Sequence, residues 1–326
     1  MRERLLEIED LITRFYTEDG VVRAVDGNSL YLKERETLGI AGESGSGKTV
    51  TALSVMRLIE NPGRIERGSI LFQGEDLLEK SDKQMQRIRG KDIAMVFQDS
   101  LSSLNPTLTI GEQVGRVLHF HTKLPSKKIR QRVVELLTQV GIPEPVKRVT
   151  NYPHEFSGGM RQRALIAMAI SCNPALLILD EPTTALDVTI EAQIFELVDG
   201  LKEQFGMGTI LITHDLAVVA NSCTRVIIMY AGRIVEEAEV EALYERPLHP
   251  YTRGLLHSIP RLEDKNQTRL FSIPGEVPDL INLPQGCNFS PRCRYANERC
   301  RQVDPQLEQI TSARKAACLR INEIDE

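Results

Sequence analysis

The chain has 326 residues, of which 41% are hydrophobic and 26% charged, so it can bury a sizeable core and wholesale disorder is excluded. Its 45 acidic residues outnumber its 40 basic ones, which disfavours a general nucleic-acid or anionic-membrane binder. No apolar run approaches the roughly 20 residues that span a bilayer, and residues 1–10 lack the apolar core of a signal peptide. We therefore expect a cytoplasmic protein that reaches a membrane only through a partner.

The first third of the chain is predicted to consist mainly of short strands. Alternating or continuous apolar runs predict strands over residues 6–12, 21–25, 29–32, 37–41, 70–72 and 93–97. The character then changes, because Ser126 can cap a helix whose apolar residues recur at helical spacing and end just before Gly141. A second helix is expected over 159–172.

Three more buried strands are predicted over 175–179, 209–213 and 225–230. A helix over 190–204 joins the first two, and a strand–helix–strand unit indicates a parallel sheet. Beyond Gly232 the chain becomes Pro-rich and weakly periodic and contains several cysteines. We place a domain boundary near residue 245.

A glycine-rich loop follows the predicted strand 37–41. Residues 42–49, GESGSGKT, fit the pattern G-x-x-x-x-G-K-[ST] between a strand and a helix, the context that a phosphate-binding loop requires. Its glycines let backbone N–H groups turn toward phosphate oxygens, Lys48 places a charge on the β- and γ-phosphates, and Thr49 can ligate Mg²⁺. The alternative is a glycine-rich turn beside a surface lysine. The expected nucleotide contacts here are Gly42, Ser44, Gly45, Ser46, Gly47, Lys48, Thr49 and Val50.

The phosphate loop alone is compatible with GTPases, kinases and ATPases. The N-K-x-D motif that recognises guanine is missing from the sequence. An apolar strand, however, ends in Asp180 and Glu181. Asp180 can hold Mg²⁺ through water, and Glu181 can polarise the attacking water. A strand capped by two solvated acids is the alternative explanation of this pair.

Four further stretches accompany the loop and the acidic strand. Ser157 to Gly159, in FSGGMRQ, would open a helix and so form a second anion-binding helix N-terminus, although a plain helix start explains them too. Gln98 follows Val-Phe, Asp187 ends Thr-Ala-Leu-Asp, and His214 lies in Ile-Thr-His-Asp. A lone histidine after a strand is more often structural.

Together these six stretches resemble the ABC-transporter ATPase family over about residues 5–240. The resemblance implies an α/β fold: a P-loop ABC ATPase domain over 1–245, with a RecA-like core, an antiparallel β subdomain and a helical subdomain at about 100–170. It implies Gln98 as the Q-loop residue and a Mg²⁺ ligand with Thr49, Asp187 in the D-loop, and His214 at the γ-phosphate. An aromatic ring at Phe15 or Tyr16 should stack on adenine. The implied signature contacts to ATP in trans are Ser157, Gly158, Gly159 and Gln162.

The family resemblance also implies that the chain works as a dimer. Each ATP lies between the phosphate loop of one subunit and the signature of the other, and this chain carries one of each. The signature reads FSGGM where the family often reads LSGGQ, but the phosphate-contacting serine and glycines remain. ATP therefore joins the subunits, and hydrolysis at Glu181 separates them and drives a membrane partner.

Four cysteines lie close together near the C-terminus, at positions 287, 293, 300 and 318. Four thiolates suit Zn²⁺ or an iron–sulfur cluster, although their spacing is not that of a zinc ribbon and four unligated cysteines are the alternative. Residues 246–252 and 288–293 resemble the C-terminal extension of the peptide- and nickel-importing branch, closest to dipeptide-permease D-type ATPases. That resemblance implies a [4Fe-4S] cluster on Cys287, Cys293, Cys300 and Cys318 within an extension over 246–326. For His249 and Tyr251 we expect simple packing.

The sequence therefore predicts the ATPase subunit of a dipeptide or oligopeptide importer, peripheral at the cytoplasmic face of the cell membrane. Its expected partners are a second ABC ATPase, two transmembrane permease subunits and an extracytoplasmic peptide-binding protein, with no nucleic acid. The alternative is a soluble ABC ATPase that acts on nucleic acid or the ribosome. Such chains usually carry two cassettes or a long coiled coil, whereas Lys48 and Asp180 here are 132 positions apart with neither between them. A third possibility, a zinc module that binds nucleic acid, would use the basic residues of segment 287–301.

Overall fold

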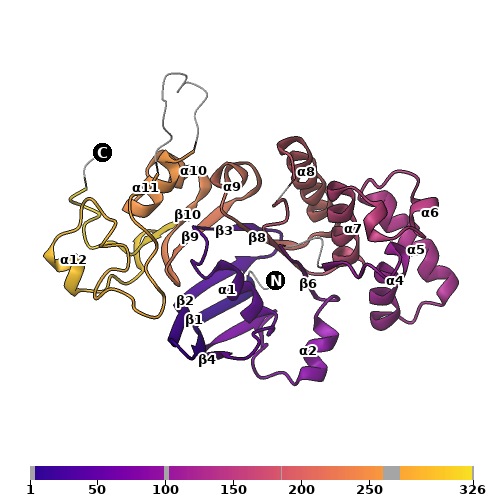
Figure 1. The fold of residues 1–326 in the computed structure, drawn as a ribbon, viewed down its shortest axis with the longest axis horizontal. Helices are drawn as coiled ribbons and strands as arrows, with labels where there is room; N and C mark the ends of the chain where they lie inside the picture. The colour runs from indigo at the N-terminus through magenta and orange to yellow at the C-terminus, as the bar shows by residue number, and fades with distance from the viewer. Residues whose placement is uncertain (1–3, 99–102, 185, 260–271, 325–326) are drawn as a thin grey trace. The chain divides into compact units, whose positions relative to one another are not determined.

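The structure is a computed structural model that describes residues 4–98, 103–184, 186–259 and 272–324 (Figure 1). The chain forms two compact units, which are described one at a time. Unit 1 comprises Met1–Leu5, Leu32–Glu36 and Glu79–Leu211, and unit 2 comprises Leu6–Tyr31, Thr37–Leu78 and Ile212–Glu326. The residues after 245 thus belong to the same compact unit as the phosphate loop.

The strands of unit 1 lie in the order β6 (Ile93–Val96), β7 (Leu176–Asp180) and β8 (Gly208–Thr213). β6 and β7 run parallel, with Ile93 opposite Leu176 and Val96 opposite Leu179. Helix α8 (Val188–Phe205) joins β7 to β8, so the predicted strand–helix–strand unit is confirmed. All residues of β7 are buried, as expected of a parallel strand that is covered on both faces.

A helical region accounts for most of the rest of unit 1. Its elements are α2 (Asp82–Ile88), α4 (Ile110–His121), α5 (Ser126–Gln139), α6 (Pro145–Arg148), the 3₁₀ turn Pro153–Glu155 and α7 (Gly158–Ile170). Helices α4, α5 and α7 pack against one another (Figure 1). Ser126 is the first helical residue of α5 rather than its cap, because Pro125 occupies the cap position without a side-chain hydrogen bond. Gly141 follows α5 with a φ of +72°, as its predicted role requires.

Unit 2 contains an antiparallel sheet in the order β2 (Gly20–Lys33), β1 (Arg4–Thr17), β4 (Gly63–Phe72) and β5 (Glu75–Asp76). β1 pairs with β4 from Leu6 opposite Phe72 to Phe15 opposite Gly63. The two strands predicted over 21–25 and 29–32 are one continuous strand, β2. Gly27, with a φ of +79°, interrupts the apolar alternation without ending the strand.

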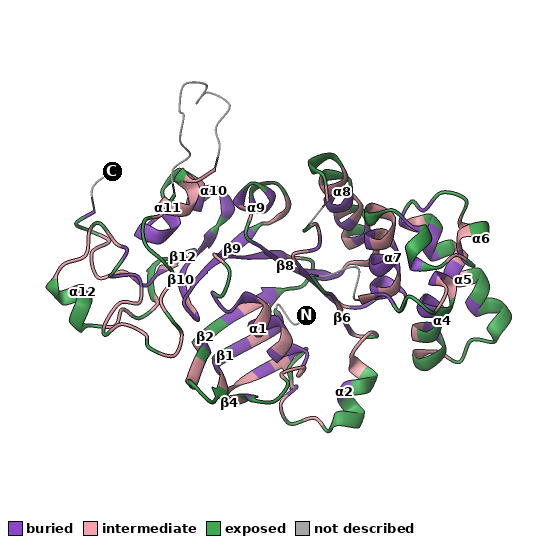
Figure 2. Ribbon diagram, in the orientation of Figure 1, coloured by how far each residue is buried: buried purple, intermediate pink, exposed green. Residues whose placement is uncertain are grey.

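The second sheet of unit 2 has the order β3 (Thr37–Ala41), β9 (Arg225–Tyr230), β10 (Arg233–Glu239), β12 (Arg314–Ala316) and β11 (Glu308–Thr311). β3 and β9 are parallel, and both are buried along their whole length (Figure 2). The pairs further along this sheet are antiparallel. Two helices of this unit follow strands, α1 (Lys48–Val55) after β3 and α9 (Leu216–Ser222) after β8.

The expectation of weak structure after Gly232 is wrong for the first part of that segment. Strand β10 begins at Arg233, and α10 (Val240–Glu245), α11 (Pro250–His257) and α12 (Glu298–Gln302) follow it. The apolar pattern of β10 is hidden by two buried acids, Glu236 and Glu237. Glu237 lies 2.6 Å from Arg225 and 3.0 Å from Lys315, which compensates the charge that the strand buries. Among the described residues, no helix is long and apolar enough to cross a membrane.

Candidate functional site

The phosphate loop lies in unit 2 between β3 and α1. Gly42 and Gly47 have φ values of +154° and +100°, and a Cβ at either would meet a carbonyl oxygen at 2.2 or 2.3 Å. Only glycine fits at these two positions. Gly47, the N-cap of α1, has no side chain, so no side-chain group of that residue caps the start of the helix. The loop thus ends at a helix N-terminus, the arrangement that binds anions in phosphate loops.

Lys48 is buried against the loop that precedes it. Its Nζ donates to the carbonyl oxygens of Gly42 at 2.7 Å and Glu43 at 2.9 Å, and lies 3.5 Å from the Ser46 hydroxyl. The side chain is therefore held inside the curve of the loop, where a phosphate-binding lysine is required. Binding of the β- and γ-phosphates by Lys48 remains a prediction.

The two candidates for adenine stacking occupy different environments in β1. Phe15 is half-buried and packs against Gly63. Tyr16 is 41% exposed, donates a hydrogen bond to Glu66, and has the Arg64 guanidinium 5.2 Å from its ring centre. Tyr16 has the more accessible ring, and adenine stacking remains a prediction for both residues.

The acidic strand of unit 1 ends as the sequence predicts. Asp180 is the last residue of β7 and is buried, and Glu181 follows it with a φ of +44°. Few residues other than glycine adopt this left-handed conformation, which costs about 1–3 kcal/mol and is concentrated at functional sites. Two side chains hold the Glu181 carboxylate: Gln98 Nε2 donates to Oε2 at 2.9 Å, and the Thr184 hydroxyl donates to the same oxygen at 3.2 Å.

Gln98 and Glu181 are 83 positions apart, so the structure joins two motifs that the sequence analysis treated separately. Thr184 opens the Thr-Ala-Leu-Asp motif, and that motif by itself predicts no contact with Glu181. Thr49, the other predicted Mg²⁺ ligand, belongs to unit 2 and Gln98 to unit 1. Their joint coordination of Mg²⁺ therefore remains a prediction.

The signature residues form the N-terminus of α7. Ser157 is the N-cap, and its hydroxyl accepts from the Met160 N–H at 3.3 Å. Ser157 and Gly158 are exposed, as contacts to a nucleotide from another subunit require. Gln162, in contrast, is only 2% exposed, so it faces the interior of unit 1 and is poorly placed for the predicted contact.

The other two predicted positions lie at helix starts. Asp187 caps α8 by accepting from the Ile190 N–H at 3.0 Å. His214 is exposed and follows β8, and the next residue, Asp215, caps α9 by accepting from the Ala217 N–H at 2.7 Å. The sharp turn after β8 thus presents His214 to solvent while Asp215 fixes the backbone beside it.

The four C-terminal cysteines line one small cavity in unit 2. Burial raises the pKa of Cys287 to about 12 and also raises the pKa values of Cys293 and Cys318. The predicted metal site is nevertheless not supported, since no group of three or more His, Cys, Asp or Glu side chains in the described ranges is placed to hold a metal ion. The sequence correctly predicted that the four cysteines lie near one another in the folded chain. Spacing along the chain does not determine the distances between their sulfur atoms.

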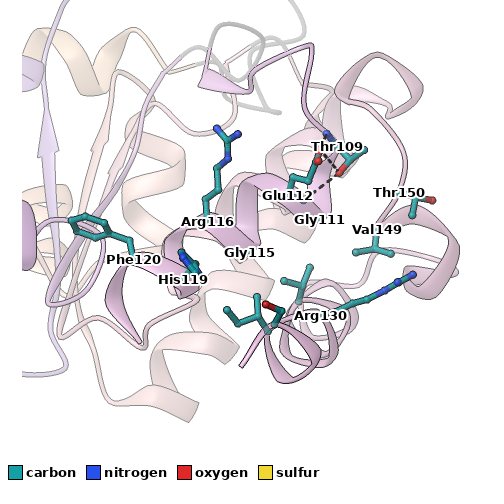
Figure 3. A pocket seen from close by; sticks show the side chains of 13 residues that line it. Thr109, Gly111, Glu112, Gly115, Arg116, His119, Phe120, Arg130, Val149 and Thr150 are labelled. Carbon is teal, nitrogen blue, oxygen red and sulfur yellow. Dashed lines mark hydrogen bonds between the residues drawn. The ribbon is translucent and has the colours of Figure 1, made fainter. Parts of the chain in front are cut away.

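A larger cavity, of about 540 Å³, lies in the helical region of unit 1 (Figure 3). It is lined by α4, the first half of α5 and residues 149–150. Gly111 allows α4 to approach Val149, whose carbonyl oxygen would lie 2.5 Å from an added Cβ. None of the predicted site residues lines this cavity.

One residue of the phosphate loop is bound by two residues from the C-terminal region, a contact that the motifs do not indicate. Glu43, Tyr251 and Arg292 are joined by hydrogen bonds, although the last two come from the C-terminal region. Tyr251 was expected only to pack, and it does so, but its hydroxyl also accepts from the Glu43 N–H at 2.8 Å. No local pattern indicates a contact between residues 249 positions apart.

Two family models match the chain. The model described as ABC transporter matches residues 25–184, and the model described as oligopeptide/dipeptide transporter, C-terminal region, matches residues 235–300. The first match contains the phosphate loop and the acidic strand. The second contains His249, Tyr251 and Arg292 together with three of the four cysteines.

Curated relatives are similar over nearly the whole chain. The oligopeptide transport ATP-binding protein OppD of Bacillus subtilis is 52% identical over 94% of this chain and 86% of its own length. A probable peptide ABC transporter ATP-binding protein of Sinorhizobium fredii is 50% identical over 98% of this chain and 96% of its own. The dipeptide transport ATP-binding protein DppD of Escherichia coli is 46% identical over 96% of both.

Solved structures support the same assignment. A post-hydrolysis dimer of the ATP-binding cassette MJ0796 with ADP and Pi has a TM-score of 0.66 and 27% identity, and the match covers 72% of this chain and 98% of that one. Fold, motifs and relatives agree, and the chain therefore belongs to the ABC transporter family as one of its ATP-hydrolysing subunits.

Proposed function

We propose that this chain is the ATPase subunit of an importer for dipeptides or oligopeptides. The observation that carries the proposal is the similarity to peptide-transport ATP-binding proteins, which extends beyond the cassette into the C-terminal region. We would not expect a soluble ABC ATPase that acts on nucleic acid or the ribosome to carry a C-terminal region similar to that of peptide transporters. We further propose the domain division into a nucleotide-binding domain over 1–245 and an extension over 246–326.

In this function each motif has a chemical role. The backbone N–H groups of the phosphate loop and Lys48 bind the phosphates of ATP, and Thr49, Gln98 and Asp180 would hold Mg²⁺, which neutralises phosphate charge. Glu181 orients the attacking water, and its carboxylate is aimed by Gln98 and Thr184. His214 contacts the γ-phosphate. Ser157 and Gly158 reach the ATP of a second subunit, because both are exposed at the start of α7.

The assembly we propose contains a second ABC ATPase, two transmembrane permease subunits and an extracytoplasmic peptide-binding protein. The chain would then be a peripheral subunit at the cytoplasmic face of the membrane. A dimer is supported by the motif content, because one chain has one phosphate loop and one signature, and by the similarity to the dimeric MJ0796 cassette. ATP binding closes the dimer, and hydrolysis opens it.

The test is uptake by proteoliposomes that contain the chain and the membrane subunits that co-purify with it. We expect ATP-dependent uptake of a labelled dipeptide or pentapeptide in the presence of the binding protein. Glu181→Gln abolishes uptake, whereas the matched control Glu196→Gln, an exposed carboxylate on α8, leaves it unchanged. ATP hydrolysis that responds to ribosomes or nucleic acid, and not to the membrane subunits, would overturn the proposal.

For the C-terminal cysteines we propose a [4Fe-4S] cluster, with zinc as the alternative. Support comes from the four thiols around one cavity, because soft thiolates suit both groups. A bound cluster would tie together the segments that carry Cys287 and Cys318.

Anaerobic purification tests the cluster proposal directly. We expect visible absorption and about four iron atoms per chain, both lost in Cys293→Ser. Cys172→Ser, which changes a half-buried cysteine in unit 1, is the matched control and should keep the iron. Stoichiometric zinc without absorption would replace the cluster by a zinc site, and protein free of both metals would reject both.

A further inference from the structure

Glu43, the second residue of the phosphate loop, is held through all of its polar groups. Its N–H donates to the Tyr251 hydroxyl at 2.8 Å, and its carbonyl oxygen accepts from Lys48 Nζ at 2.9 Å and from the Ser46 N–H at 3.2 Å. Its carboxylate receives both terminal nitrogens of Arg292, at 2.6 and 3.1 Å. The same residue therefore connects the phosphate-binding lysine to the C-terminal region.

Contacts other than those to Glu43 also hold the Arg292 side chain in place. Its side chain is 5% exposed, its Nε donates to the Pro274 carbonyl at 3.0 Å, and Nη2 also donates to the Ile273 carbonyl at 3.3 Å. The guanidinium lies 5.8 Å from the ring centre of Tyr230. Because these contacts already hold the planar guanidinium, it loses little further conformational entropy when it donates two hydrogen bonds to a carboxylate.

Tyr251 is fixed just as firmly. It is fully buried in the first turn of α11, and its ring centre lies 4.6 Å from Tyr230 and 5.4 Å from Phe289. Phe289 and Arg292 come from the same short segment. The two contacts to Glu43 thus share one aromatic cluster, made of Tyr230, Tyr251 and Phe289.

A negatively charged carboxylate in a phosphate-binding loop weakens nucleotide binding, because the triphosphate that the loop binds is itself strongly negative. Arg292 neutralises Glu43, and the side chain of Glu43 is only 30% exposed, so solvent screens this charge incompletely. Without Arg292, the carboxylate would repel the nucleotide. It would also be free to move, and the carbonyl that holds Lys48 would move with it.

We propose that Arg292 and Tyr251 are positioning residues for ATP binding, which hold and neutralise Glu43 so that the phosphate loop is ready for the triphosphate. This inference rests on the proposed assignment of residues 42–49 as the ATP site. It gives the C-terminal region a direct role in nucleotide binding, independent of any metal or cluster on its cysteines.

The test compares Arg292→Ala with five other variants of the full chain. We expect Arg292→Ala to weaken ATP binding and raise the KM for ATP about tenfold, the size typical of a lost charge-assisted contact, with a much smaller change in kcat. Arg292→Lys restores part of the affinity. Arg299→Ala removes an exposed arginine of the same segment and leaves binding unchanged.

The double variant E43Q/R292A separates the electrostatic role from a structural one. If the uncompensated carboxylate repels ATP, removing it restores much of the affinity lost in Arg292→Ala. For the same reason, the affinity of Arg292→Ala for ATP should fall less with added salt than that of the wild-type chain. Tyr251→Phe keeps the ring and loses the hydroxyl, so it should raise the KM without changing the salt response.

The outcomes are distinguishable. An unchanged KM in Arg292→Ala, in protein whose thermal unfolding matches the wild type, overturns the inference. A loss of affinity that neither Arg292→Lys nor E43Q/R292A reverses also overturns it, since that result indicates a packing role alone. Lys48→Ala tests the premise separately: if that variant binds ATP normally, the assignment of the ATP site fails, whatever Arg292 does.

Discussion

At the scale of single residues, the Glu181 carboxylate depends on its neighbours. Gln98 and Thr184 both donate to Oε2, and the backbone of Glu181 is held at a φ of +44°. A catalytic carboxylate whose direction is fixed in advance needs no reorganisation when water arrives. We therefore expect Gln98 to matter for turnover more than for nucleotide affinity.

Gln98→Ala should lower kcat about tenfold or more, because it removes a hydrogen bond to a charged group that contributes about 1.5–3 kcal/mol. ATP affinity, followed by calorimetry, should change little. Gln131→Ala is the control, since Gln131 donates to Glu135 at 3.1 Å on the exposed face of α5. Equal losses of turnover in both variants would contradict the role of Gln98. The sequence also predicts that the segment from Gln98 to Pro106, between the ATP site and the helical subdomain, contacts the membrane subunits, so crosslinks from Ser103 should reach a permease loop. Ser102, in the same segment, lies outside the described residues.

Lys48 is the second residue-scale test. Lys48→Ala removes the positive charge from the phosphate site, together with the hydrogen bonds that Nζ donates to the carbonyls of Gly42 and Glu43. We expect ATP affinity to fall at least about tenfold by calorimetry. Lys83→Ala changes an exposed lysine of α2 and should bind ATP like the wild type. Unchanged affinity in Lys48→Ala would argue against the phosphate-loop assignment.

At the scale of elements, the start of α7 combines two roles, because Ser157 caps the helix and belongs to the signature. Ser157→Ala should cost about 1 kcal/mol of stability and should also weaken ATP-dependent association of two subunits. Ser81→Ala removes the equivalent cap of α2, where Ser81 accepts from the Gln84 N–H. We expect comparable shifts in thermal unfolding for both variants and a loss of association for Ser157→Ala alone. Loss of association in both variants would indicate that Ser157 acts only as a helix cap.

At the scale of the whole molecule, the chain should form a dimer that depends on ATP. Glu181→Gln retains ATP without hydrolysing it, so light scattering should report a doubled molar mass when ATP is added. The double variant Lys48→Ala with Glu181→Gln should remain monomeric, because the nucleotide that joins the subunits cannot bind. A dimer of the same strength with and without ATP would contradict this mechanism.

The chemistry of the cassette could be predicted from the sequence because each motif is local. The loop around Lys48, the acid pair at the end of β7 and the serine before α7 each need only a few consecutive residues in a strand–turn–helix setting. Helices α5, α7 and α8 and the buried strands β3, β7, β8 and β9 were predictable for the same reason, since their apolar spacing is regular.

Tertiary structure decided what depends on residues far apart in the chain. The bond between Gln98 and Glu181, the buried acids of β10 and the burial of Gln162 follow from packing that no short window encodes. The contact between Arg292 and Glu43 spans 249 positions. A local pattern reports the conformation of its own residues. A contact of this length exists only because the folded chain brings a buried arginine to a partly buried carboxylate, where each charge compensates the other.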